Sequence, residues 1–288
     1  MSIAITTARP RRSSALGDTL RGIYIVWYRD LLRYWRDRVR AIVGLAQPLL
    51  FLVVFGAGLG SSLGGSFSAG GPSGSLSYAQ FVYPGVVGMA VLFSAIFGAM
   101  SIVWDREFGF LKEILVAPID RSAVAIGKAL GGATQAMIQG LVLLVLAPLI
   151  GVKLDIGSVL LLIPFLFVLA FALSAMGVAL ASRMKSMQGF QIVMNFLLMP
   201  LFFLSGSLFP LTNVPDWMAV LGRLDPVSYG MDPIRRIVLG ATLPAQAVDS
   251  LGLTLFGHVL PIGLEALILL AFGAVMLGLG VVNFRRRE

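Results

Sequence analysis

The sequence predicts an all-α membrane protein with six transmembrane helices. Its composition and its charge distribution both predict this class. Of the 288 residues, 58% are hydrophobic and only 12% are charged, and the mean hydropathy is +0.91. An ordinary soluble domain carries about 25% charged residues. The charged residues are also clustered, which leaves long stretches that contain none.

Six stretches are long enough to span a bilayer, since a helix needs about 20 apolar residues to cross about 30 Å of hydrocarbon. They cover residues 41–60, 81–104, 129–150, 157–182, 187–209 and 259–284. Only the last contains a charged residue, Glu265. We therefore divide the chain into a cytoplasmic amphipathic interface segment, residues 1–40, and a six-helix transmembrane domain, residues 41–288.

The distribution of Lys and Arg predicts the orientation. If both termini lie inside, eighteen of these residues fall on the cytoplasmic side and four on the outer side. This bias agrees with the positive-inside rule. The first forty residues hold nine arginines and no apolar core of signal-peptide length, so we expect the N-terminus to stay in the cytoplasm.

The N-terminal segment has the pattern of an amphipathic helix. An apolar stripe with helical spacing comprises Leu20, Ile23, Tyr24, Trp27, Leu31 and Tyr34. The arginines, among them Arg29, Arg33 and Arg36, lie largely off that stripe. Such a helix suits the membrane interface, either as an anchor alone or as a contact for a cytoplasmic partner.

The two large outer loops differ. Residues 61–80 are rich in Gly and Ser, which is typical of a flexible connection. The last outer loop, of about 48 residues from Pro210, instead carries apolar clusters with helical spacing around residues 217–224 and 234–238. We expect two short helices there, half-embedded at the outer surface.

The segment between the second and third spans carries the most informative pattern. It reads WDREFGFLKEILVAPIDRSAVAIGK from Trp104 to Lys128. We expect Asp105 and Glu107 at the start of a short helix, where carboxylates favour the positive end of the dipole, and Pro118 at its end. A short amphipathic helix joined to two spans can transmit force from a soluble partner. A solvated connector is the alternative.

WDREFGFLKEILVAP, preceded by YPGVVGMAVLFSAIFGAMS, resembles the signature of permease subunits of type-2 ABC exporters. These include daunorubicin-resistance permeases, nodulation-factor exporters and O-antigen and teichoic-acid permeases. FFLSGSLFPLTNVPDWMAVLGRLDPVSYGMDPIRR resembles the family's last outer loop. The resemblance covers nearly the whole chain. The residues that match the family's coupling motif are Asp105, Arg106, Glu107, Gly109, Leu111 and Pro118; the usual small polar residue after the glycine is Phe110 here.

The resemblance implies two permease chains, identical or similar, that pair with two ABC ATPase subunits in a bacterial inner membrane. The interface helix and the loop after the second span would dock onto the ATPases. The complex would move an amphipathic drug, lipid or lipid-linked glycan outward. ATP and Mg²⁺ would bind the partner, and we expect no cofactor on this chain: its one Gly-Lys pair, Gly127-Lys128, is followed by Ala129, so it is no P-loop.

Few polar residues inside the spans could touch cargo. Gln191 and Asn195, one turn apart in the fifth span, could line a polar pathway or hydrogen-bond across a dimer. Glu265, about two turns into the sixth span, is either a substrate or proton contact or a residue near enough to the outer interface to reach water. With no cysteine and one histidine, we expect no metal site, and nucleic-acid binding is not indicated.

Two other classes remain as alternatives. An ion-gradient-driven secondary transporter or channel should carry several ionisable residues inside its spans, and only Glu265 is available. A membrane-embedded enzyme should bring acid, base or metal groups together, and the outer acids Asp216, Asp225 and Asp232 are instead expected in turns or at helix starts. We therefore favour an ABC permease without its own ATPase site.

Overall fold

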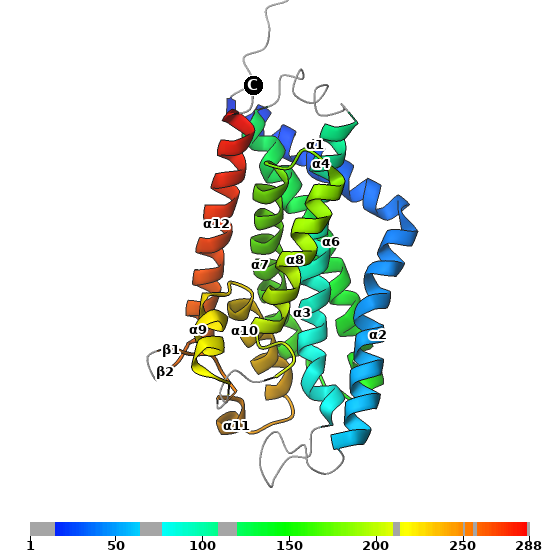
Figure 1. The fold of residues 1–288 in the computed structure, drawn as a ribbon, viewed down its shortest axis with the longest axis vertical. Coiled ribbons are helices and arrows are strands. Elements are labelled where there is room, and N and C mark those ends of the chain that lie inside the picture. Colours follow the sequence, from blue (N-terminus) through cyan, green and yellow to red (C-terminus); the bar gives the residue numbers. More distant parts are fainter. Residues whose placement is uncertain are drawn as a thin grey trace, which may run out of the picture.

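The computed structural model describes residues 15–63, 77–108, 120–209, 214–249, 251–255 and 258–286, and forms an elongated bundle of helices (Figure 1). In chain order the helices that form the interface segment and the spans are α1 (Ala15–Arg36), α2 (Arg38–Leu63), α3 (Tyr78–Gly98), α4 (Met100–Glu107), α6 (Arg121–Leu146), α7 (Ile156–Ala181), α8 (Met187–Leu204) and α12 (Ile262–Arg286). Shorter elements are η3 (Ala147–Ile150), α9 (Asp216–Leu224), α10 (Ser228–Gly240), α11 (Ala245–Asp249) and the antiparallel pair β1 (Thr254–Leu255) and β2 (His258–Val259). The all-α prediction is confirmed.

Within the described residues, five helical segments are long and apolar enough to span a membrane: residues 78–107, 121–150, 156–181, 187–204 and 262–285. A sixth span is counted if α1 and α2 are taken as one bent pair, since their described helical parts meet at an angle of 69°. The second span is α3 continued by α4. The five segments coincide with the second to sixth spans predicted from hydropathy, and the first predicted span, residues 41–60, lies in α2, the second half of the bent pair.

Capping residues explain where several spans begin. Ser77 and Gln80 form a capping box at the start of α3. Asp120 accepts a hydrogen bond from the amide of Ser122 in α6, Asp155 from those of Gly157 and Ser158 in α7, and Ser186 from that of Gly189 in α8. Each cap satisfies an amide that the helix itself leaves without a partner.

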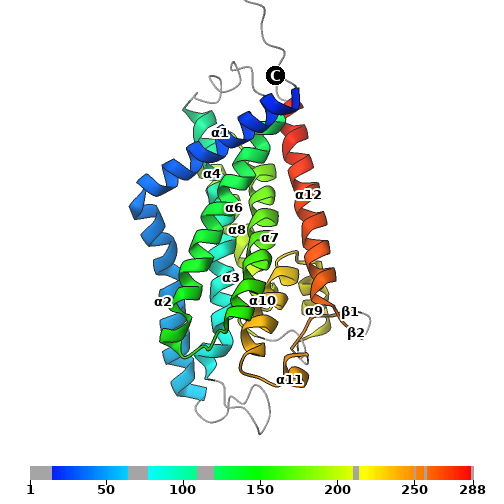
Figure 2. The ribbon, with the colours of Figure 1, turned by 180° about the vertical axis from the view of Figure 1, so that it is seen from behind.

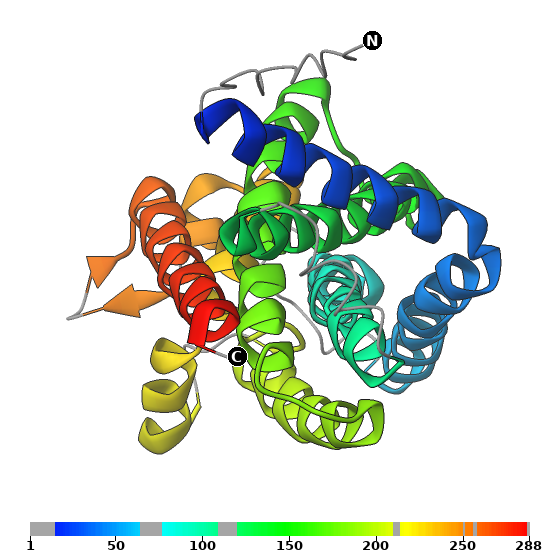
Figure 3. The same cartoon turned by 90° about the horizontal axis from the view of Figure 1, so that it is seen from above.

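The central layer consists of α3, α6 and α7, and α2, α8 and α12 stand around it (Figure 3). Tyr83 is fully buried, and its hydroxyl donates to the carbonyl oxygen of Leu143 at 2.6 Å, which joins α3 to α6. At Gly85 the backbone of α3 meets the chain after α8: an added Cβ would lie 2.1 Å from the carbonyl oxygen of Ser207. The spans therefore approach closely where side chains are small.

α1 lies across one end of the bundle, which we call the α1 end (Figure 2). It packs against the beginning of α6, where Gly127 and Gly131 leave room for it. A Cβ at Gly127 would lie 2.8 Å from Cβ of Val26, and one at Gly131 would lie 3.1 Å from Cβ of Asp30. The Gly-x-x-x-Gly pair thus sets how closely α1 can approach the third span.

The opposite end, which we call the α10 end, holds the predicted outer helices (Figure 1). Both helices are present, but only α9 is largely exposed. α10 is buried over most of its length and packs against α3, α7 and α12. Both predicted helices are therefore present, and they differ in that three spans enclose α10.

Candidate functional site

A buried ion network joins three elements at the α1 end. The ammonium of Lys128, on α6, lies 3.1 Å from Oδ1 of Asp30 on α1 and 3.0 Å from Oδ2 of Asp105 on α4. It also donates to the hydroxyl of Ser101 at 3.0 Å. Lys128, Asp30 and Asp105 are 3%, 4% and 1% exposed. Their charges are therefore compensated by one another and not by water.

Two arginines of α1 extend this network toward the surface. Nη2 of Arg29 lies 3.1 Å from Oδ2 of Asp105, and Nη1 of Arg33 lies 3.5 Å from its Oδ1. The Arg29 and Arg33 side chains are 40% and 47% exposed. Asp105 thus receives three cations, from α1 and from α6.

The position of Asp105 corrects one expectation. Asp105 and Glu107 lie in the last turn of α4, which ends at Glu107, and not at the start of a helix. A carboxylate at this end faces the negative pole of the helix dipole, which is unfavourable. The helix of the second span continues beyond its apolar residues as far as Glu107. The cations of the network compensate the charge of Asp105 at that end.

Arg106 and Glu107 attach the same turn to the connection between the fourth and fifth spans. The guanidinium of Arg106 donates to the carbonyl oxygens of Ala181, at 3.5 Å, and of Met184. The carboxylate of Glu107 accepts from the backbone amide of Met187, the first residue of α8, at 2.8 Å. Three consecutive residues therefore link α4 to α1, α6, α7 and α8. The other residues of the motif, Gly109, Leu111 and Pro118, lie outside the described residues.

The buried face of α1 is shifted from the predicted stripe. Tyr34 is buried as expected, but Leu20 and Tyr24 are 66% and 58% exposed, and the charged residue Asp30 is buried. Trp27 reaches α6, where its indole nitrogen donates to Oγ1 of Thr134 at 3.0 Å. The arginines also divide: Arg29 and Arg33 turn toward Asp105, whereas Arg36 is exposed.

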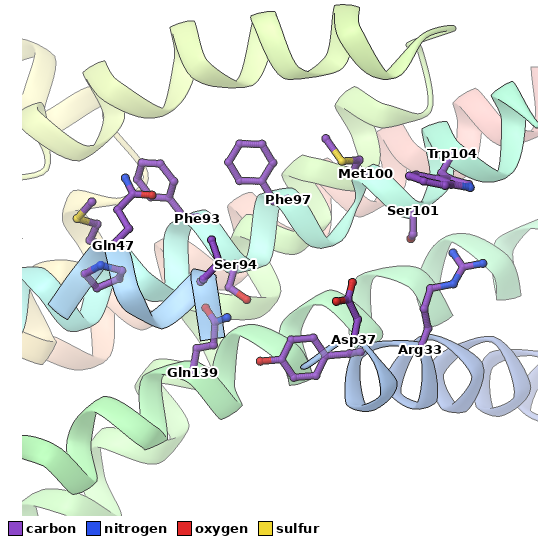
Figure 4. Close-up of a pocket in the computed structure, with 15 residues that line it drawn as sticks. Arg33, Asp37, Gln47, Phe93, Ser94, Phe97, Met100, Ser101, Trp104 and Gln139 are labelled. Atoms are coloured by element: carbon purple, nitrogen blue, oxygen red, sulfur yellow. The ribbon is translucent and has the colours of Figure 1, made fainter. Parts of the chain in front are cut away.

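A cavity of about 660 Å³ adjoins the network and opens beside the bend between α1 and α2 (Figure 4). Its apolar wall comes mainly from α3 and α4 and comprises Met89, Phe93, Phe97, Met100 and Trp104. Its polar lining comprises Arg33, Asp37, Gln47, Ser94, Ser101 and Gln139. Arg33 and Ser101 belong to the network as well, so a molecule in the cavity would touch side chains that hold Asp105 and Lys128.

The three residues suggested for the pathway do not come together. Gln191 and Asn195 are exposed on the outer face of α8. Glu265 lies at the α10 end, in the first turn of α12 and not two turns into a span, and its exposure is 0%. The interpretation that Glu265 reaches water is therefore wrong for this chain, because α10 covers it.

Sequence reasoning missed Lys128 and Asp30. In the sequence, the Gly127-Lys128 pair serves only to exclude a P-loop, and no pattern points to Asp30. A usable signal is present: Lys128 directly precedes a long apolar stretch and lies between Gly127 and Gly131, where a neighbouring helix can approach closely. A lysine in such a place needs a carboxylate partner if it is buried. Which carboxylate that is depends on the packing of α1, which no local pattern gives.

The fold and site define a multi-pass membrane protein whose charged end is tied together by buried ion pairs. Comparison with known proteins then gives the family. Residues 21–239 match the family model described as ABC-2 type transporter, so the chain belongs to that family.

Three relatives agree with this assignment. The chain is 28% identical to the protein ycf38 of Cyanophora paradoxa over 74% of this chain and 72% of the relative. It is 27% identical to nodulation protein J of Rhizobium leguminosarum bv. trifolii over 75% of this chain and 80% of the relative. It is 26% identical to the inner membrane transport permease YadH of Escherichia coli K12 over 75% of this chain and 82% of the relative. The chain is thus an ABC transporter permease, a transport subunit that works with ABC ATPase subunits.

Proposed function

We propose that this permease is the membrane subunit of an exporter that moves an amphipathic drug, lipid or lipid-linked glycan outward across a bacterial inner membrane. The ATP, with Mg²⁺, is bound and hydrolysed by a separate subunit. The complex contains two permease chains and two ATPases. The observation that carries the proposal is the buried network around Lys128, which ties the interface helix to the second and third spans.

The network supports a mechanical role for the α1 end. A push on α1 reaches Asp105 on α4 directly through Arg29 and Arg33. Lys128 carries it to α6, and Arg106 and Glu107 carry it to α7 and α8. Since breaking a buried ion pair is costly, these elements should move together and not slide past one another.

The charge distribution supports placing the α1 end in the cytoplasm. Among the described residues, α1 carries Arg21, Arg29, Arg33 and Arg36 across that end. Arg183 donates to Asn283 near the end of α12, and Arg121 donates to the carbonyl oxygen of Arg285. An ATPase that docks there meets a basic surface, and so do the anionic lipids of the cytoplasmic leaflet.

The cavity beside the α1–α2 bend supports an amphipathic cargo. Its aromatic and methionine wall suits an apolar body, and its polar lining, with Arg33 and Asp37, suits a polar group at the other end. A ligand pocket of ordinary size holds about 300–1,000 Å³, and this cavity of about 660 Å³ falls within that range.

The test uses the complex purified with its ATPase and reconstituted in vesicles. Asp105→Asn and Arg29→Gln/Arg33→Gln should leave the ATPase bound but lower ATP-driven transport of a fluorescent amphipathic dye or phospholipid at least tenfold. Lys153→Gln, which changes an exposed cation outside the α1 helix, is the control, and it should transport normally. The ATPase rate gives a readout that needs no cargo. The permease should change the rate of the ATPase in the control variant but not in the network variants.

Two outcomes would contradict the proposal. Transport unchanged in Asp105→Asn would show that the network does not couple the subunits. Uphill transport by the permease alone, in vesicles without any ATPase, would instead favour the secondary transporter.

A further inference from the structure

An open cleft adjoins the cavity beside the α1–α2 bend. The cleft has a volume of about 550 Å³, and its lining comprises Arg29, Leu32, Arg33, Arg36 and Asp37. Arg33 and Asp37 also line the cavity of about 660 Å³, so the cleft and the cavity meet at these two side chains. A molecule that enters the cavity from this side therefore passes a row of arginines on α1.

The charges of this region do not balance. Arg29 and Arg33 both contact Asp105. Arg36 is exposed and forms no ion pair with another described residue. The network, the cleft and the cavity together hold four cations and three carboxylates: Arg29, Arg33, Arg36 and Lys128 against Asp30, Asp37 and Asp105. The excess positive charge lies at the mouth of the cavity, where it favours an anionic group.

Arg33 can bind an anion without leaving the network. Its contact with Asp105 uses Nη1 alone, at 3.5 Å, and its side chain is 47% exposed. A guanidinium carries five N–H donors in a fork that matches a phosphate group. Arg36 follows three residues later on α1, and residues at this spacing are neighbours on a helix surface. Two guanidiniums can therefore converge on one phosphate.

The cavity changes in character along its length (Figure 4). Arg33 and Asp37 lie at one end. The other end has uncharged polar side chains from α2, α3 and α6: Gln47, Ser94 and Gln139. Aromatic rings from α3 and α4 run along one side: Phe93, Phe97 and Trp104. Charge is therefore confined to the end nearest α1, and the rest suits a chain that is apolar or carries uncharged polar groups.

We propose that the α1–α2 bend binds a membrane lipid with a phosphate headgroup. Arg33 and Arg36 bind the phosphate, and an acyl chain lies against the aromatic side of the cavity. The aromatic and methionine wall favours a lipid over a soluble phosphate ion. Basic pockets between helices at the cytoplasmic side commonly bind anionic headgroups. This assignment rests on the proposed function, which places the bend at the cytoplasmic leaflet, and it narrows the cargo to an anionic lipid.

The test measures lipid binding and needs neither ATP nor transport. The full-length chain, purified with its ATPase in detergent, is titrated with phosphatidylglycerol or phosphatidylcholine that carries bromine on its acyl chains, and quenching of tryptophan fluorescence is followed. The background is Trp35→Phe/Trp217→Phe, because both tryptophans are exposed and Trp104 in the cavity then remains as a reporter beside Trp27. This background should bind phosphatidylglycerol more tightly than phosphatidylcholine.

Single changes in this background locate the site. Arg36→Gln should weaken phosphatidylglycerol binding about threefold to fivefold, as for one exposed charge contact, and leave phosphatidylcholine binding unchanged. Asp37→Asn should tighten phosphatidylglycerol binding, because it removes a negative charge from the mouth. Ser94→Phe fills the cavity and should reduce quenching by both lipids. Arg21→Gln is the matched control, since it removes an exposed arginine of α1 that lines neither the cleft nor the cavity.

Three results would overturn the assignment. One is equal affinity for the two lipids in the background. Another is an equal effect of Arg36→Gln and Arg21→Gln, which would mean that α1 attracts anions through its overall charge alone. The third is a preference for phosphatidylglycerol that vanishes when the ATPase is bound, which would assign the arginines to the interface between the subunits. Unchanged transport in Asp105→Asn would contradict the coupling function and not this lipid site, so the two proposals fail separately.

Discussion

Lys128→Met is the most informative single change, because it removes the central cation of the network and keeps most of the side-chain volume. Two buried carboxylates, Asp30 and Asp105, would lose contacts of 3.1 Å and 3.0 Å, respectively. Breaking a buried pair in this way costs about 3–5 kcal/mol, since an uncompensated charge stays buried. Arg29 and Arg33 remain near Asp105, so we expect the lower limit, about 3 kcal/mol.

The assay is thermal unfolding of the purified chain in detergent. A loss of about 3 kcal/mol should lower the melting temperature by roughly 6–12 °C. Lys153→Met is the matched control: Lys153 is exposed, and its substitution should change stability by less than about 0.5 kcal/mol.

A double mutant separates the charge effect from packing. Lys128→Met/Asp30→Asn removes the cation together with one of its two carboxylates, so the second change should recover part of the loss. Strictly additive losses in the double mutant, or a melting temperature of Lys128→Met within 2 °C of the unsubstituted chain, would refute the view that these charges hold α1, α4 and α6 together.

Three further predictions concern other regions. Burial raises the pKa of Asp225 to about 8, so the folded state holds a proton that the unfolded chain releases near pH 4. The stability of the folded chain should therefore fall as pH rises between about 4 and 8. Asp225→Asn should flatten this part of a profile of melting temperature against pH. Gly85→Ala should destabilise by about 1–3 kcal/mol through its clash with Ser207, whereas Gly278→Ala, with open space around it, should be neutral or slightly stabilising in the same assay. Tyr83→Phe should cost about 1 kcal/mol in denaturant unfolding, because its buried hydroxyl donates to α6.

Much of the fold could be predicted, because in a membrane the hydrophobic length of each segment nearly fixes its structure. Backbone groups cannot be left unpaired in hydrocarbon, so an apolar stretch such as residues 156–181 must be helical. The outer helices α9 and α10 also followed from spacing. The burial of these two helices could not be predicted from spacing. α9 and α10 have similar amphipathic patterns, yet only α10 is covered by α3, α7 and α12.

The candidate site was predicted in part. The segment from Asp105 to Glu107 was singled out, and the structure shows what each residue contacts. Its helical end was assigned wrongly, because local dipole preference was outweighed by cations from other elements. Asp30 and Lys128 lie 98 residues apart in the chain, and the sequence around either residue does not predict its partner.

The sequence by itself determined the class, the spans and the family, since hydropathy and charge asymmetry act through properties of each segment alone. Only the tertiary structure decided which charges meet. A buried charge is tolerated only beside its counterion, and the pairing of Lys128 with Asp30 and Asp105 depends on how separate helices cross. Such crossings are set by packing of small residues, such as Gly127 and Gly131, against a distant helix.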